Sequence, residues 1–170
     1  MPAALPHDAG PGTTVRSGSR RVAGTAWNTR IVRQLVTGID ADGRSCVVNE
    51  TTNGPTGPAV SVHTVFETAG NPAPSRPPGH GGAMDLKVPV GIARWILVQW
   101  PPGLTAAMHH TDTIDFDTVL AGSIDIVLAD GAHRLDAGDC VVVNGVDHAW
   151  EAGPDGCTMG VLLLGTPAPA

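Results

Sequence analysis

The sequence has little of what marks nucleic-acid-binding, membrane-spanning or secreted proteins. Of its 170 residues none is Tyr, aromatic residues make up 4%, and Lys87 is the only lysine. With a formal net charge of -6 the chain has no basic stripe, which argues against a nucleic-acid partner. No apolar run is long enough to cross a bilayer, and the N-terminus lacks the apolar stretch of a secretory signal. We therefore expect a cytoplasmic protein that does not bind membranes.

Cysteine is also scarce, and its spacing does not suit a metal site. Cys46, Cys140 and Cys157 lie far apart, and no Cys-x-x-Cys pair is present. A zinc site built from cysteines is therefore not expected, and we predict free thiols inside the protein.

Glycine and proline, in contrast, are abundant. The chain has 22 glycines and 15 prolines, which argues against long helices and favours short elements joined by turns. In the C-terminal half, β-prone segments alternate with turn signals at short intervals, as is typical of an all-β sandwich or barrel. These segments are Ile92–Trp100, Asp115–Leu120, Ser123–Leu128, His133–Leu135, Cys140–Val143, His148–Glu151 and Met159–Leu164.

The N-terminal half is less regular. Residues 1–26 are rich in Gly, Pro, Ser and Arg, and we predict a flexible arm before a single domain at 27–170. Three further elements are expected upstream of Ile92. They are a β-hairpin of Arg30–Val36 and Ser45–Asn49 around a turn at 38–43, a strand at Val60–Glu67, and a long Pro/Gly loop at 69–83.

A spaced set of Gly, His and Asp begins at residue 103. Gly103 is followed after five residues by His109, and six residues separate Asp115 from Gly122. This spacing resembles the first motif of the cupin family, which runs Gly, five residues, His-x-His, then Glu, and after six more residues Gly.

A second set begins at residue 138. Gly138-Asp139 precedes the β-prone Cys140–Val143, and Gly145 and His148 follow. This order is similar to the second cupin motif, and residues 118–128 between the sets resemble the family's central hairpin. The resemblance covers 103–164 and implies an all-β, mainly antiparallel barrel of the double-stranded β-helix or jelly-roll type, with the N-terminal β-hairpin added to it.

The histidines depart from the family pattern. If His109 is the first histidine of His-x-His, Thr111 takes the place of the second; if His110 is the second, Met108 takes the place of the first. Asp115 stands where the family has Glu, and the Pro of the second motif is absent. The family's full set of three His and one Glu is therefore not present.

Many cupins hold a divalent metal ion inside the barrel, and the resemblance implies the same here. The ligands would come from His109, His110, Asp115 and His148, and the metal could be Zn, Fe, Mn or Ni. On an unbroken strand His109, Thr111 and Asp115 share one face, whereas a turn near Thr111 would let His110 pair with Asp115. The sequence leaves both registers open.

Further polar and aromatic residues could complete a site. Asp117 is a candidate general base, although it could equally be a charge at a strand edge. His63 and Arg94 fall on predicted strands and are candidate catalytic residues, with Arg94 able to clamp a substrate carboxylate. We expect the substrate pocket to include Thr111, Trp100, Trp150 and Gln99.

The resemblance to cupins implies a metal-dependent enzyme acting on a small organic substrate, by lyase, dehydratase or isomerase chemistry, in a secondary-metabolic or catabolic pathway. An Fe(II) dioxygenase and a non-catalytic cupin that binds a small molecule are the alternatives. A structural or storage barrel ranks last, because storage cupins are two-domain chains and the motifs occur once. Small cupins are often dimers, so the resemblance also implies a homodimer.

Overall fold

The computed structural model describes residues 31–56, 60–70 and 73–170, so the predicted arm at 1–26 lies outside the described residues. These residues form strands and loops and no helix, and hence no helix that could span a membrane. The strands are β1 (Val32–Ile39), β2 (Ser45–Asn53), β3 (Gly82–Ala83), β4 (Ala93–Trp100), β5 (Thr105–His110), β6 (Thr113–Leu128), β7 (Gly131–Asp136), β8 (Cys140–Val143) and β9 (His148–Gly165).

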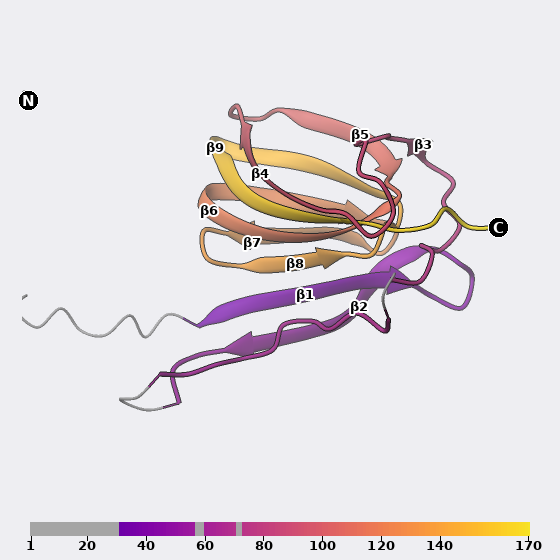
Figure 1. Ribbon diagram of the computed structural model, residues 1–170. Coiled ribbons are helices and arrows are strands. Elements are labelled where there is room, and N and C mark those ends of the chain that lie inside the picture. The colour runs from indigo at the N-terminus through magenta and orange to yellow at the C-terminus, as the bar shows by residue number, and fades with distance from the viewer. Residues whose placement is uncertain (1–30, 57–59, 71–72) are drawn as a thin grey trace, which may run out of the picture.

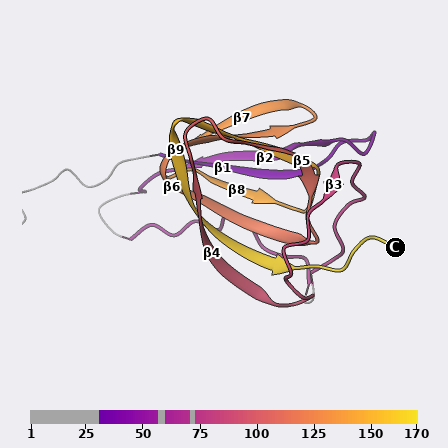
Figure 2. The ribbon, with the colours of Figure 1, turned by 90° about the horizontal axis from the view of Figure 1, so that it is seen from above.

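Two long strands, β6 and β9, belong to both walls of a flattened barrel (Figure 1). The first half of β6 pairs with β8, and the second half of β9 pairs with β4. This wall therefore runs β2-β1-β8-β6-β9-β4. The second half of β6 pairs with β7, while the first half of β9 pairs with β5, so the other wall runs β7-β6-β9-β5-β3. Figure 2 shows β4 curving along the outside of β9.

Glycines allow β6 and β9 to bend together where they pass from one wall to the other. Gly122 has φ +72°, and a Cβ there would lie 2.0 Å from the carbonyl oxygen of Gly156, which has φ +76° itself. Only glycine accepts both the left-handed backbone and this close approach. Turn signals at Gly122 and Gly153-Pro154 predict strand ends, but in the structure each lies inside one long bent strand.

The N-terminal hairpin is confirmed and extends the first wall. Asp40 caps its turn, because its carboxylate accepts hydrogen bonds from the backbone N–H groups of Asp42 and Arg44. Strand β1 then pairs in parallel with β8, and β3 pairs in parallel with β5, so the sheet is mixed although most of its pairings are antiparallel.

The predicted strand at Val60–Glu67 is wrong, because this segment has no strand pairing. It lies over the outer face of the first wall and contributes side chains instead of backbone hydrogen bonds. Val65 and Phe66 pack on a buried cluster that includes Val142, and the Phe66 ring lies 5.9 Å from that of Phe116. The segment is β-prone in composition because it covers a sheet.

The main core lies between the two walls. Its buried side chains come from β1, β6, β7, β8 and β9, and Leu35, Ile124, Ile126 and Leu135 are fully buried. On β4, side chains alternate: Ile96 and Val98 pack on this core, whereas Trp95 and Leu97 are exposed on the outer face. The sheet alternation thus fixes which residues reach the interior.

Candidate functional site

A cavity of about 180 Å³ opens between the two walls of the barrel. Most of its surface is apolar, and the polar side chains come from β5, β6, β9 and the residue after β5. The lining residues are Met84, Leu86, Ile96, Val98, Trp100, Ala106, His109, Thr111, Asp115, Asp117, His148, Trp150, Met159, Val161 and Leu163. It is smaller than the cavities that hold drug-sized ligands, so it suits a small molecule.

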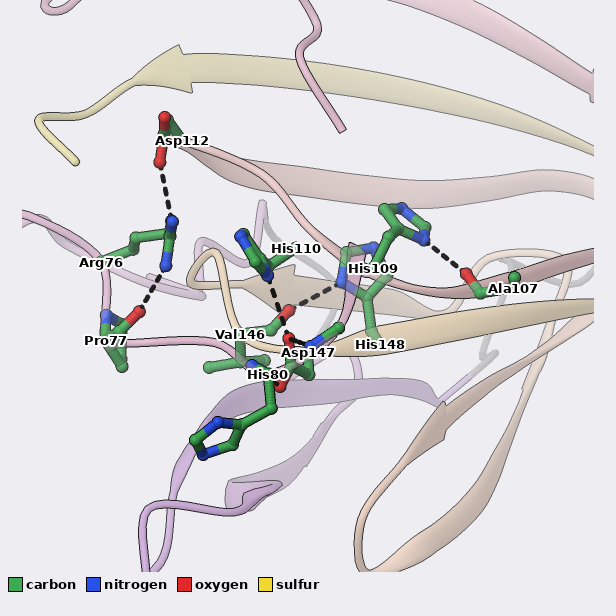
Figure 3. A network of polar contacts seen from close by, with 11 residues as sticks. Arg76, Pro77, His80, Ala107, His109, His110, Asp112, Val146, Asp147 and His148 are labelled. Atoms are coloured by element: carbon green, nitrogen blue, oxygen red, sulfur yellow. Dashed lines mark hydrogen bonds and ion pairs between the residues drawn. The ribbon is translucent and has the colours of Figure 1, made fainter. Parts of the chain in front are cut away.

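His109 and His148 meet inside this cavity. Their strands are paired so that His109 lies opposite His148, and the ring centroids are 4.2 Å apart. In each ring Nδ1 donates to a backbone carbonyl, to Ala107 at 2.8 Å and to Val146 at 2.9 Å (Figure 3). In a neutral ring this anchoring fixes the tautomer and makes Nε2 the acceptor.

The charge state of the second histidine follows from its burial. His148 is 1% exposed. Burial, and then the charge of nearby His109, lower the pKa of His148 to about 4. At neutral pH this ring is therefore an uncharged imidazole that can accept a hydrogen bond or a proton.

Two aspartates of β6 face the same cavity, because residues two apart on a strand share a face. Asp115 and Asp117 are both buried. Burial raises the pKa of Asp115 to about 6. Burial, together with the neighbouring charge of Asp115, raises the pKa of Asp117 well above its ordinary value. Both carboxyl groups therefore keep their protons to a higher pH than free aspartates do.

One carboxylate oxygen of this pair has no partner. Oδ1 of Asp115 is buried and makes no hydrogen bond within the described protein. Beside it Thr111 accepts a 2.9 Å hydrogen bond from the Thr113 hydroxyl. A buried oxygen without a partner is costly unless a ligand satisfies it, so this atom points to a binding role.

The structure decides between the two registers that the sequence leaves open. His109, Thr111 and Asp115 line the cavity, whereas His110 does not. His110 Nδ1 instead donates to Asp147 Oδ1 at 3.2 Å, outside the cavity (Figure 3). The prediction that His110 joins the inner site is thus wrong, because successive side chains of a strand point to opposite faces and His110 directly follows His109 in β5. Thr111 stands where the second histidine of the cupin motif would be.

Asp147 fastens the Pro/Gly loop to the outside of the barrel. Its carboxylate accepts the backbone N–H groups of His80 at 2.6 Å and Gly81 at 2.9 Å, besides the His110 contact. A Cβ at Gly79 would lie 2.5 Å from His110 Nδ1, so the loop packs tightly there. We call Asp147 with His110, His80 and Gly81 the loop latch.

The latch matters because the same loop supplies part of the cavity wall. Strand β3 pairs with His109 and His110 of β5, and Met84 and Leu86 then line the cavity. A salt bridge of 2.7 Å from Arg76 to Asp112 attaches the loop at a second point. Sequence reasoning missed Asp147, Met84 and Leu86; the signals were the glycine cluster at 79–82 and an acidic residue directly before the motif histidine.

Three other predicted site residues lie outside the cavity. Arg94 is exposed and donates to the backbone oxygens of Leu86 and Lys87, so it clamps the loop and no substrate. His63 is exposed and contacts the carbonyl of Gly54. Gln99 is exposed because its position on β4 is one of those whose side chains point outward. Trp100, Trp150 and Thr111 do line the cavity, as does Asp117.

The arrangement of these groups does not suit a metal ion held by three or more protein ligands. The two anchored imidazoles are close enough to act together. Among the described residues, however, no three His, Cys, Asp or Glu side chains converge on one point. Thr111 removes the third imidazole, and the aspartates are shorter than the glutamate of the cupin motif. The predicted divalent metal therefore has only part of its ligand set here.

Curated relatives match a minority of the chain, and no family model matches it. The phomopsin biosynthesis cluster protein C' of Diaporthe leptostromiformis is 40% identical over 77 residues, which is 45% of this chain and 37% of that protein. The phomopsin biosynthesis cluster protein D of the same organism is 44% identical over 55 residues, 32% of this chain and 29% of that protein. The chain thus matches about a third of the length of each relative.

Solved structures that match part of the chain include cupins. A cupin-2 domain-containing protein from Shewanella frigidimarina covers 41% of this chain and 68% of its own, with 24% identity and a TM-score of 0.37. A sugar phosphate isomerase of the cupin superfamily from Silicibacter pomeroyi covers 44% and 52%, with 26% identity and a TM-score of 0.39.

The fold class follows from the barrel itself. Its walls share β6 and β9, and residues of both predicted motifs, His109 and Asp115 from the first and His148 from the second, line one cavity between them. The described residues therefore form an all-β barrel, as the motif spacing predicts.

Proposed function

We propose that the protein is a cupin enzyme of natural-product biosynthesis that moves protons on a small, largely apolar substrate, by lyase, dehydratase or isomerase chemistry. The names of the curated relatives, both from a biosynthesis cluster, support the pathway class. The cavity supports the chemistry.

One observation carries this proposal: two buried carboxyl groups and two anchored imidazoles line the same small apolar cavity. General acid–base catalysis needs groups that hold or accept a proton near the working pH. Burial raises the pKa of Asp115 to about 6, which puts it in that range. Neighbouring carboxyls whose environments separate their pKa values are a common way to obtain one acid and one base.

The roles follow from these proton affinities. Asp117, whose pKa is raised by burial and by the charge of Asp115, is the general acid that donates to a leaving oxygen or to a carbonyl oxygen of the substrate. In the neutral His109 ring Nδ1 carries the proton, so Nε2 is the base that removes a proton from the substrate. The apolar walls exclude water, which strengthens these interactions.

The experiment is to replace the gene in the parent organism with an Asp117→Asn allele and compare metabolites by mass spectrometry. A dehydratase or lyase predicts accumulation of a compound heavier than the normal product by the mass of the group eliminated, water for a dehydratase. An isomerase predicts accumulation of a compound of equal mass. A product that normally gains oxygen atoms would favour the dioxygenase alternative, and an unchanged profile would overturn the enzymatic proposal in favour of a non-catalytic binding protein.

A further inference from the structure

An apolar patch lies on the outer face of the first wall, on the side of the sheet that faces away from the cavity. It consists of Trp95 and Leu97 of β4, Leu120 of β6 and Leu162 of β9, and we call it the β4 patch. Trp95 is 80% exposed and Leu97 is 68% exposed. Side chains of this size are usually buried, so a group of them in water points to a partner.

The four side chains form one continuous surface. In the strand pairing Trp95 lies opposite Leu162, and Leu97 lies opposite Gly160. A Cβ added at Gly160 would lie 3.7 Å from Trp95 Nε1 and 3.6 Å from Leu120 Cδ1, so both side chains cover this glycine. Together the four side chains expose an apolar area on the order of 500 Å², near the upper limit of the largest patch on an ordinary monomer.

The β4 patch is a part of the outer face that the described chain does not cover. Nearer to β8, the segment 60–67 lies over the same face and packs Val65 and Phe66 on it. Toward β4, which runs along the rim of the wall in Figure 2, the four side chains of the patch stay exposed.

The strand that carries half of the patch is also an edge of the sheet. Among the described residues β4 pairs with β9 alone, and it has no bulge. Proteins usually protect such an edge with charges, proline or a bulge. At the other edges β2 carries exposed Glu50, and β7 carries exposed Arg134 and Asp136. The one charged residue of β4, Arg94, is bound to the carbonyls of Leu86 and Lys87 instead.

We propose that a second copy of this chain covers the β4 patch, packing its own β4 patch against it about a two-fold axis to form a homodimer. A two-fold interface brings the same surface of both copies together, so the surface must be self-complementary, and an uncharged apolar patch meets this condition. The chain has a net charge of -6, and at this patch two copies meet without opposing like charges.

The area agrees with a stable dimer. A standard interface buries about 800 Å² of each partner, and homodimer interfaces are about two-thirds apolar. The β4 patch supplies on the order of 500 Å² of this area, and the next outward pair, Gln99 opposite Thr158, begins a polar rim. The dimer concerns a surface outside the cavity, and it stands whether or not the cavity is catalytic.

The test is sedimentation equilibrium of the full chain over a hundredfold range of protein concentration, up to about 100 μM. We expect a reversible dimer. Leu97→Asp, which places a charge inside the patch of both copies, should raise the dissociation constant at least about thirtyfold, as loss of a central apolar contact does. Val48→Asp, at an exposed position on the opposite edge strand β2, is the matched control and should leave the dissociation constant unchanged.

Two results would overturn the proposal. A wild type that stays monomeric throughout this range leaves the patch to a different protein, and a dimer of equal stability in Leu97→Asp places the interface elsewhere. Circular dichroism and urea unfolding establish that Leu97→Asp is folded.

A second measurement does not depend on the folding of Leu97→Asp. In the wild type, acrylamide quenching of tryptophan fluorescence should decrease as the protein concentration rises through the dissociation constant, because Trp95 becomes covered. Trp95→Phe keeps an apolar ring, so it should still form the dimer but lose most of this concentration dependence. A concentration dependence that persists in full in Trp95→Phe contradicts an interface at the β4 patch.

Discussion

The His110 imidazole and the Asp147 carboxylate meet 3.2 Å apart outside the barrel cavity, while their sequence neighbours His109 and His148 meet inside it. Both contacts follow from one strand register, in which His109 lies opposite His148. Side chains alternate between the two faces along each strand. His110 follows His109 on one strand and Asp147 precedes His148 on the other, so these two side chains meet on the opposite face. One register thus builds the inner pair and the loop latch together.

Replacing Asp147 by Ala should release the loop. The change leaves the N–H groups of His80 and Gly81 without their acceptor, and the loss of these two hydrogen bonds, one exposed and one part-buried, costs about 1–3 kcal/mol in total. Urea unfolding should show this loss, and amide hydrogen exchange should quicken at 80–84 before the rest of the protein. Asp155→Ala, an exposed aspartate, is the control. Equal exchange at 80–84 in both variants would show that the latch does not hold the loop.

Asp117→Asn should stabilise the metal-free protein at high pH. The folded pKa of Asp117 is raised above the ordinary 3.8, so its contribution to stability is fully present below about pH 4 and is lost as pH rises towards the folded pKa. Asn stays neutral throughout. In urea titrations with EDTA, the free energy of unfolding of the variant should rise relative to that of the wild type as the pH increases from about 4.5 to about 8.

Two further substitutions test the direction of this pH dependence. Asp115, whose folded pKa is raised to about 6, should give the same trend when replaced by Asn. Asp42→Asn, on an exposed turn, should give none. A loss of stability in Asp117→Asn that grows with pH would mean that the carboxylate is ionised and paired in the folded state.

Gly122→Ala should destabilise the barrel far more than glycine replacement at another left-handed position. The new Cβ would lie 2.0 Å from the Gly156 carbonyl oxygen in addition to the φ of +72°. Gly43 has a φ of +76° and open space around its would-be Cβ, so Gly43→Ala carries the backbone strain alone. We expect about 1 kcal/mol for Gly43→Ala and more than about 3 kcal/mol for Gly122→Ala by urea unfolding. Similar losses of stability at both positions would contradict the close approach of Gly122 to the Gly156 carbonyl oxygen.

Thr111→His should create the metal site that the present ligand set leaves incomplete. It adds an imidazole beside His109 and His148 on the cavity wall. Calorimetric titration with Zn²⁺ should show binding at least about tenfold tighter than in the wild type, as expected for one further nitrogen ligand. Met108→His adds an imidazole at an exposed position and should give no such gain. Tight stoichiometric Zn²⁺ binding by the wild type itself would show that the existing donors already close on an ion.

Much of the fold could be predicted because the two motifs combine turn residues and β-prone runs at fixed spacing. Gly103, Gly122 and Gly138 all have positive φ, so their positions report backbone geometry directly. The hairpin around Asp40 and the strand Ile92–Trp100 are likewise local signals. The long strands β6 and β9 escaped prediction, since a glycine inside a bent strand looks like a turn in the sequence.

The candidate site could be predicted only in part. Which face a strand residue occupies, and what a loop contacts, both depend on residues far away in the sequence. Adjacent His109 and His110 carry the same chemistry, and only the pairing with β9 decides which one faces inward. Arg94 lies on the same side of β4 as the inward-facing residues. Its long side chain nevertheless leaves the cavity and donates to the backbone of the 69–87 segment. The role of Asp147 could not be predicted, because its hydrogen-bond partners belong to that loop, which is distant in the sequence.

The bend that β6 and β9 share also governs how the cavity can open. Since each strand runs through both walls, the walls cannot part like two separate sheets without breaking the longest ladder in the molecule, and they unfold as one cooperative unit. The stretch carrying Met84 and Leu86 borders the cavity outside this ladder, and the loop latch and Arg94 hold it in place. A small molecule that enters past this stretch would have to break those hydrogen bonds, so we expect ligand exchange to become faster when the latch is weakened.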